Sequence, residues 1–309
     1  MDGIRTATPE QEGFAEAMVD HGLLIRSEIP GLYGRSHAFE DLRRRVDDML
    51  TAVWADEHAE RMHFPPLMPR RQLETMEYHA SFPHLIGTVF AFDGDEPGAA
   101  DLAVRAAAHE PYADDLAIGD LVVTPATCYP VYPAIAARGP VPDGGVTVDP
   151  GDGWVFRREP SHDPARMQCF HMRELVRIGA PEDVMAWRDA WRERLVARYT
   201  ELGLSLVLEL ANDPFFGRGG RIMARQQRAQ ELKWEVMAPI AGPEPTAITS
   251  FNYHQDHFGQ IFGLRLEDGR EAHSACLGLG EERIALALIA AHGMDLEGWP
   301  ASVRADLWR

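Results

Sequence analysis

Apolar positions that recur every three or four residues predict several helices. A helix is expected from His37 onward, because Ser36 is a residue type that caps helices and the apolar residues after it recur at helical spacing. These apolar residues are Leu42, Val46, Met49, Leu50, Val53 and Trp54. A short helix is expected over residues 99–109 and a long one over residues 181–203, where Gly203 suits the left-handed position that ends a helix.

Other segments have the character of strands. Runs rich in β-branched and aromatic residues, separated by turns, occupy residues 121–132, 205–210, 233–237, 248–253 and 260–266. Pro130 and Pro133 break the first of these runs. The stretch HSACLGLGEERIALALIAAHG predicts a strand, a glycine-rich bend and a buried helix that is apolar almost all round. Strands joined as hairpins, with clustered helices, predict a single α+β domain over residues 1–309, built on an antiparallel sheet.

A hairpin rich in charged residues is expected between residues 153 and 179. Its first strand-like run ends in Arg157 and Glu159, and its second runs from Arg166 to Phe170. Arginine makes paired hydrogen bonds to phosphate oxygens, a carboxylate can accept from the adenine amino group, and an aromatic ring can stack on the base. These groups suit a nucleoside triphosphate, although such a hairpin in isolation is more often a solvated face.

A second motif opens the buried helix near the end of the chain. Gly278 and Gly280 precede Arg283, which lies in the first turn of that helix. Glycine lets the backbone approach a ligand closely, and a helix N-terminus favours phosphate. A Gly-x-Gly bend alone often serves packing only, but an arginine at the head of an apolar helix indicates a phosphate site.

The composition narrows the class of protein. The chain has 309 residues, 45% of them hydrophobic, which is enough for a sizeable core. Its net charge of -18 argues against a nucleic-acid partner, because surfaces that bind nucleic acid are normally basic. No apolar run could span a membrane, and the N-terminus lacks the layout of a signal peptide. Three widely spaced cysteines do not resemble a disulfide framework, so a reducing, cytoplasmic location is expected.

A basic stripe contrasts with this acidic composition. It consists of Arg218, Arg221, Arg225 and Arg228. Spacings of three, four and three residues place these arginines on one side of a helix over about residues 218–233. The stripe is either a solvated helix face or a docking surface for an acidic partner.

The two nucleotide motifs together resemble those of class II aminoacyl-tRNA synthetases. Phe-Arg-x-Glu, a loop and Arg-x-x-x-Phe are similar to their motif 2, and Gly-x-Gly-x-x-Arg before an apolar helix is similar to their motif 3. Residues 64–83 would be a degenerate motif 1, which builds the dimer interface in that family. The resemblance implies a homodimer with a central antiparallel sheet that binds ATP.

Further stretches resemble the seryl branch and its truncated homologues, the amino acid:[carrier protein] ligases. KWEVMAPI and SFN look like the seryl branch, and LYGRS, FPPLMPR and FNYHQDHFG look like the ligases. The chain lacks the long tRNA-binding arm and an anticodon domain, so nearly all of it is expected to form a stand-alone catalytic core. Thr-Ala-Ile-Thr at residues 246–249 departs from the Glu-Val-Ser-Ser of seryl enzymes, which puts one usual metal or ATP carboxylate in doubt.

The resemblance implies a role for each motif residue. The implied ATP-binding set is Arg157 for the α-phosphate, Glu159 for the adenine amino group, Arg166 for the γ-phosphate, Phe170 for one face of the base, Gly278 and Gly280 beside the nucleotide, and Arg283 for the other face and the terminal phosphates. Arg157, Glu159 and Arg283 are the catalytic members of this set. Mg²⁺ would bridge the phosphates.

A zinc site is also implied. Cys128, Glu174 and Cys276 stand where zinc-containing seryl enzymes have a Cys/Glu/Cys site. Two thiolates and a carboxylate suit Zn²⁺ and leave one position open for a substrate amino group. Sparse cysteines are also common as plain core residues. The candidates for the amino-acid pocket are Lys233, Glu235 and Asn252.

The implied function is that of an AMP-forming ligase. ATP would activate a small amino acid (glycine, alanine or serine) as its adenylate, and the phosphopantetheine thiol of an acidic carrier protein, docked on the arginine stripe, would then take the aminoacyl group. Two alternatives are a catalytically silent amino-acid sensor and transfer to tRNA or another acceptor. Intact Arg157, Glu159 and Arg283 argue against the first, and the missing arm and the net charge argue against the second.

Overall fold

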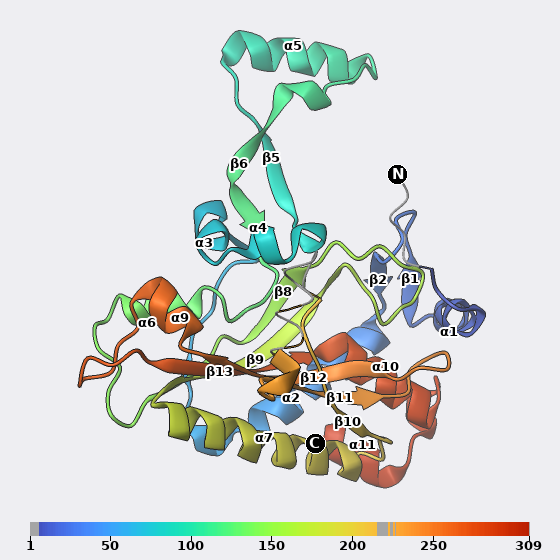
Figure 1. Cartoon of the computed structure of the whole chain (residues 1–309). Coiled ribbons are helices and arrows are strands. Elements are labelled where there is room, and N and C mark those ends of the chain that lie inside the picture. Colours follow the sequence, from blue (N-terminus) through green and yellow to red (C-terminus); the bar gives the residue numbers. More distant parts are fainter. Residues whose placement is uncertain (1–5, 215–221, 223–224, 226, 309) are drawn as a thin grey trace.

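The fold is built on a central sheet (Figure 1), seen in a computed structural model that describes residues 6–214, 222, 225 and 227–308. Its strands are β3 (Glu60–Arg61), β7 (Val146–Asp149), β8 (Asp152–Phe156), β9 (Cys169–Gly179), β10 (Val207–Leu210), β11 (Lys233–Ala238), β12 (Thr246–Gln255) and β13 (His273–Gly280). Among the described residues the strand order is β10-β11-β12-β13-β9-β7-β3, and β8 also pairs with β9. The pairs are antiparallel apart from β3 with β7, so the predicted α+β class is confirmed.

Helices cover one face of this sheet. They are α2 (His37–Val53), α7 (Pro181–Glu201), α10 (Glu281–His292) and α11 (Ala301–Leu307). Leu175 of β9, Leu277 of β13 and Phe251 of β12 lie opposite one another in register and are fully buried in the same core as these helices. Because successive residues of a strand point to opposite faces, the residues between them lie on the other side of the sheet.

The helices begin and end for local reasons. The Ser36 hydroxyl accepts a hydrogen bond from the Phe39 backbone N–H at 3.3 Å, which caps α2 as predicted. After α7, Gly203 has a positive φ of 79°, which confirms the predicted helix end. Ile284 and Leu288 of α10 are fully buried, and each such side chain stabilises the fold by about 1.5–3 kcal/mol. The buried helix α10 therefore fixes the position of the motif at its head.

A second sheet forms an arm that projects away from the main body (Figure 1). Its elements are β4 (Leu67–Pro69), α3 (Arg70–Thr75), α4 (Tyr78–Ser81), β5 (Thr88–Phe92), α5 (Glu96–Ala107) and β6 (Leu116–Val123), with the strands in the order β4-β6-β5. Helix α5 lies at the far end, and none of its residues, all of which are described, is buried. It begins three residues before the predicted start, because the Asp95 carboxylate caps it by accepting from the Gly98 N–H at 3.0 Å.

Smaller elements complete the described chain. They are α1 (Pro9–Asp20), β1 (Leu24–Arg26), β2 (Tyr33–Arg35), α6 (Val131–Ala136), α9 (His257–Phe262) and the short 3-10 turns Ala55–Glu57, Pro83–Leu85, Ala113–Asp115 and Leu296–Gly298. Strands β1 and β2 form an antiparallel hairpin. Within the described residues, no helix is both long enough and apolar enough to cross a lipid bilayer.

Three local predictions are wrong. The strand expected over residues 121–132 ends at Val123, and Pro133 lies in the first turn of α6, where the missing N–H of proline is tolerated. The strand expected over residues 260–266 is instead the end of α9 followed by a turn. The glycines of the expected bend, Gly278 and Gly280, lie within β13 itself.

The fully buried Arg173 provides a test of the fold. Its guanidinium pairs with Asp47 of α2, and Nη2 lies 2.6 Å from Asp149 Oδ2. Removing one partner of a buried ion pair leaves an uncompensated charge, so we expect Arg173→Ala to lower the free energy of unfolding in urea by about 3–5 kcal/mol. Arg61, which lies 3.5 Å from the same Asp149 but is half exposed, is the control, and Arg61→Ala should lower it by less than about 1 kcal/mol. Equal losses would contradict this account.

Candidate active site

The sheet face away from the helices carries a block of polar side chains. Directly opposite residues of antiparallel strands point to the same face. Lys233 of β11 lies opposite Asn252 of β12, which lies opposite Cys276 of β13. The next row across the strands contains Glu235, Ser250, Gly278 and Glu174. The sheet register therefore brings the predicted pocket residues and two of the predicted metal ligands onto one surface.

Cys128, Glu174 and Cys276 form a compact, buried cluster. One ligand atom from each residue lies within 4.8 Å of the other two. Cys128 comes from the segment between β6 and α6, whereas Glu174 and Cys276 lie on the neighbouring strands β9 and β13. One Glu174 oxygen accepts from the Thr127 hydroxyl at 2.8 Å and from the Cys128 backbone N–H at 2.6 Å. These bonds orient the carboxylate toward the thiols, so the structure brings together the three residues that the resemblance implied.

Burial dominates the electrostatics of this cluster. It raises the pKa of the Cys128 thiol, and the neighbouring Cys276 and Glu174 add to the effect. Burial also raises the pKa of the Glu174 carboxyl, although the bonds from Thr127 and Cys128 oppose it. At Cys276, the hydrogen bond with Cys128 lowers the thiol pKa, but burial and the Glu174 charge raise it by more. Three anions together are therefore unfavourable unless a cation joins them, and two sulfurs with one oxygen fit Zn²⁺.

Gly278 is required by a close approach within this surface. A Cβ added at Gly278 would lie 2.9 Å from the Ser250 Oγ and 3.7 Å from the Glu174 Oε1. Any side chain at this position would displace Ser250 or crowd the carboxylate. The nearest contacts of a Cβ at Gly280 would be Arg283 side-chain atoms at 3.6 Å, which is ordinary packing. The glycine at position 278 therefore serves close packing against Ser250 and Glu174, and the predicted approach to a nucleotide stays a prediction.

The loop between β8 and β9 carries the predicted phosphate and adenine groups. Arg157 and Glu159 follow β8, and Arg166 precedes β9. The Arg157 Nε donates to the Pro125 carbonyl at 3.0 Å, and its guanidinium carbon lies 5.8 Å from the centre of the Phe170 ring. The Arg166 guanidinium lies 3.9 Å from a Glu159 carboxylate oxygen. The loop therefore brings two cations, a carboxylate and a ring close together.

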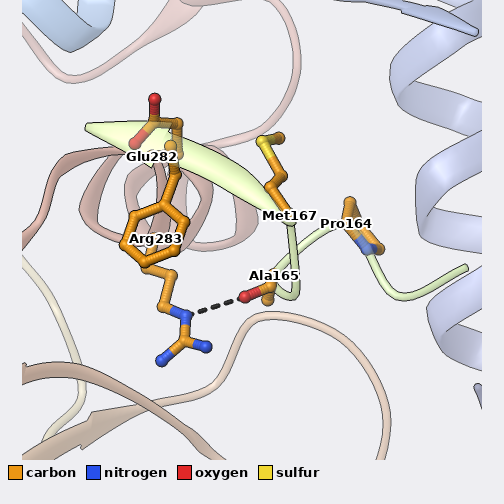
Figure 2. Close-up of a pocket in the computed structure, with 6 residues that line it drawn as sticks. Pro164, Ala165, Met167, Glu282 and Arg283 are labelled. Atoms are coloured by element: carbon orange, nitrogen blue, oxygen red, sulfur yellow. Dashed lines mark hydrogen bonds between the residues drawn. The ribbon is translucent and has the colours of Figure 1, made fainter. Parts of the chain in front are cut away.

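A pocket opens between this loop and the head of α10 (Figure 2). It is lined by Pro164, Ala165, Met167, Phe170, Glu282 and Arg283. The Arg283 Nε donates to the Ala165 carbonyl at 2.7 Å, the dashed line of Figure 2, and Nη1 donates to the Ala247 carbonyl at 2.9 Å. Burial, followed by the charge of Arg166, lowers the pKa of the Arg283 guanidinium. Phe170 and the fixed Arg283 thus line one small pocket, and their role around an adenine base stays a prediction.

The sequence interpretation missed Asp213, which holds Lys233 in place. Its Oδ1 accepts from the Lys233 Nζ at 2.5 Å, and its Oδ2 accepts from the Gln227 side-chain amide at 2.8 Å. The Lys233 Nζ also lies 3.1 Å from a Glu235 oxygen. Burial lowers the pKa of Lys233, but these two carboxylates raise it by more, so the ammonium stays charged. An aspartate after a strand is usually a turn residue, so the sequence carried little signal.

The arginine stripe is described only in part. Arg218 and Arg221 lie outside the described residues. Arg225 and Arg228 have helical backbone and exposed side chains, and the Arg228 Nε donates to the Asn212 side chain at 3.1 Å. The docking role of this stripe stays a prediction.

The architecture is that of the class II aminoacyl-tRNA synthetase catalytic domain. The chain is similar to the seryl-tRNA synthetase of Methanopyrus kandleri solved with A. aeolicus tRNASec, with a TM-score of 0.82, 21% identity, and coverage of 95% of this chain and 60% of that chain. It is also similar to the cytoplasmic serine–tRNA ligase of Naegleria fowleri solved with AMP, with a TM-score of 0.69, 13% identity, and coverage of 96% and 59%. The chain thus spans about three fifths of these solved chains.

Sequence relatives define a narrower family. The chain is 42% identical over 275 residues to amino acid–[acyl-carrier-protein] ligase 1 of Bradyrhizobium diazoefficiens, which covers 89% of this chain and 84% of that relative. It is 43% identical over 278 residues to ligase 2 of the same organism, with coverage of 89% and 82%. No protein-family profile matches the chain. The chain belongs to the amino acid–[acyl-carrier-protein] ligase family.

The Cys/Glu/Cys cluster predicts a pH-dependent metal affinity. Metal ligation requires Cys128 and Cys276 as thiolates, and their raised pKa values let protons compete with the metal. We therefore expect the affinity for Zn²⁺, measured by competition with a chromogenic chelator, to increase from about pH 6 to about pH 8, with protons released on binding. Cys276→Ser should lose the metal, whereas Cys169→Ser, outside the cluster, should bind as the wild type does. An affinity independent of pH would contradict thiolate ligation.

Proposed function

We propose that this protein activates a small amino acid with ATP and transfers it to the phosphopantetheine thiol of a carrier protein. The first step forms an aminoacyl-adenylate and pyrophosphate, and the second forms an aminoacyl thioester and AMP. One observation carries the proposal. Phe170 of β9 lines the pocket at the head of α10, and Glu174, four residues further on the same face of β9, belongs to the Cys/Glu/Cys cluster that could hold a metal ion. The identity with two named carrier-protein ligases supports the acceptor.

In the first step, the loop between β8 and β9 acts on ATP. Arg157 would hold the α-phosphate and stabilise the charge that develops on it. Arg166 would bind the γ-phosphate, and Glu159 would accept from the adenine amino group. Phe170 and Arg283, which line the same pocket, would enclose the base. ATP would enter with Mg²⁺, whose charge offsets that of the phosphates.

The metal cluster would define the amino-acid site. Cys128, Glu174 and Cys276 would hold Zn²⁺, which supplies a Lewis acid with one open position for the substrate amino group. The Asn252 side-chain amide lies 3.4 Å from the Cys276 sulfur, and Lys233 stands in the same row. The substrate would be a small amino acid, glycine, alanine or serine, as the resemblance implies. Glu235, held by Lys233, would complete the pocket.

In the second step, the carrier thiol must reach the adenylate. Arg225 and Arg228 are exposed on the segment that also carries Gln227, and Gln227 contacts Asp213 beside the pocket. An acidic carrier would dock on these arginines, with Arg218 and Arg221 extending the stripe, because a chain of net charge -18 would otherwise repel it.

Three broader expectations belong to this proposal. Residues 1–309 would act as one catalytic domain, and two chains would pair as a homodimer through residues 64–83. The cytoplasm would be the location, which the free thiols of Cys128, Cys169 and Cys276 support.

Amino-acid-dependent ATP–pyrophosphate exchange, measured across the standard amino acids, tests the first step. We expect exchange with one or two small amino acids, lost on zinc chelation and restored by Zn²⁺. Arg157→Ala should reduce exchange by about 100-fold or more, because it removes a group that stabilises the developing charge. The exposed neighbour Arg158 is the matched control, and Arg158→Ala should change exchange little. No exchange with zinc-loaded protein would instead favour an amino-acid sensor without catalysis.

Charge reversal at Arg225 tests the carrier dock. We expect Arg225→Glu to raise the KM for the carrier about tenfold at low salt, with ATP–pyrophosphate exchange unchanged. The effect should shrink at high salt, because salt screens exposed charges. Arg44→Glu, a reversal at another exposed arginine, on α2, is the control and should leave the KM unchanged. If both variants transfer as the wild type does, the dock lies elsewhere.

A further inference from the structure

His254 of β12 occupies an irregular position beside the metal cluster. The preceding residue, Tyr253, pairs with Ala275. The following residue, Gln255, pairs with Ser274, so His254 is the extra residue of a β-bulge and has no partner on β13. Bulges change the direction of a side chain and are frequent next to active sites. The irregularity here accompanies an imidazole that points at the cluster.

The two ring nitrogens of His254 face different groups. Nδ1 lies 3.1 Å from the Ser274 hydroxyl and 3.5 Å from the Tyr132 hydroxyl. Nε2 lies 3.6 Å from the Cys276 sulfur. The rings of Tyr132 and Phe258 stack with their centres 3.9 Å apart, and both meet the imidazole edge to face. Packing thus fixes the ring with Nε2 toward one sulfur.

These contacts determine what His254 offers to Cys276. The sulfur of a metal-bound cysteine is a thiolate and therefore a hydrogen-bond acceptor. Ser274 and Tyr132 carry hydroxyls, which can donate to Nδ1 of a neutral ring. Beside a thiolate, a neutral ring is favoured with its proton on Nε2, because a bare Nε2 lone pair would face the anionic sulfur, and a charged ring carries a proton there as well. In either state Nε2–H donates to the sulfur.

Cys276 receives a second N–H from the same strand. The Asn252 side-chain amide lies 3.4 Å from its sulfur and also donates to the Ser250 hydroxyl at 3.1 Å. His254 is not itself part of the metal-ligand cluster found among the described residues, whose ligand atoms all lie within 4.8 Å of one another. It therefore acts on a metal through Cys276.

We propose that His254 is a positioning residue for the metal, because its Nε2–H orients the Cys276 thiolate and stabilises it as an anion. The proposal rests on the zinc site of the proposed function. Groups that hydrogen-bond to metal ligands typically change metal affinity 10- to 100-fold when they are removed. Without His254, the Cys276 sulfur would keep only the Asn252 donor and lose one of the two N–H groups that orient it.

Two substitutions separate the hydrogen bond from packing. His254→Phe keeps a ring against the stacked Tyr132 and Phe258 but has no N–H, whereas His254→Gln keeps an amide N–H. We expect His254→Phe to bind Zn²⁺ about 10- to 100-fold more weakly in chelator competition, and His254→Gln to stay within about threefold of the wild type. The thiolate-to-metal charge-transfer band of the Co²⁺-loaded protein should shift in the Phe variant only, a readout of the sulfur that does not depend on catalysis.

His273 provides the matched control. It lies on β13, and its Nδ1 contacts the Tyr253 hydroxyl on the opposite face of the sheet, so His273→Phe should leave metal affinity and the band unchanged. If wild-type protein binds the metal and His254→Phe changes neither readout, the positioning role is wrong and the proposed function stands. Equal weakening in the Phe and Gln variants would assign the effect to packing and overturn the role. Wild-type protein that binds neither Zn²⁺ nor Co²⁺ would overturn the zinc site as well.

Discussion

Side chains along β9 alternate between the hydrophobic core and the polar face of the sheet, and this alternation fixes the position of the candidate site relative to the core. Arg173 and Leu175 point toward the helices, and Glu174 between them points into the polar surface. A slip of one residue would bury Glu174 among the helices and expose Leu175 on the active-site face. Pairing with β13 along one edge and with β7 and β8 along the other holds β9 in register. The hydrophobic core therefore determines where the carboxylate of the metal cluster lies.

Sequence predicted the long, periodic elements of the fold well. The helices α2 and α7 match their predicted spans, because a long amphipathic segment has only one face to bury. Short apolar runs were ambiguous. The segment 260–266 looks like a strand, but its first residues form the end of α9. This short helix contains the buried Phe258 and packs against α6 and β13. Local pattern does not contain that tertiary contact, so the choice between strand and helix could not be made from it.

The residues of the candidate site also fall into those that the sequence predicted and those that it missed. The motif residues that meet in the structure are linked in the sequence by resemblance to known motifs, as are Phe170 with Arg283 and the three members of the Cys/Glu/Cys cluster. Asp213 belongs to no motif, and His254 lies in the ligase-like stretch FNYHQDHFG without a role that the stretch assigns to it. Their importance comes from a lysine 20 residues away and a cysteine 22 residues away, which only sheet register and a bulge bring into contact.

The contact between Gln227 and Asp213 has a thermodynamic consequence. Gln227 accepts from the Asp213 backbone N–H at 2.7 Å and donates to its carboxylate at 2.8 Å, and the other carboxylate oxygen holds Lys233. Consecutive hydrogen bonds thus connect the arginine-bearing segment with Lys233, a residue of the proposed amino-acid pocket. Two binding events that perturb one such network share a coupling free energy, and that coupling is reciprocal. If a bound amino acid raises the affinity for the carrier protein, a bound carrier protein must raise the affinity for the amino acid by the same factor.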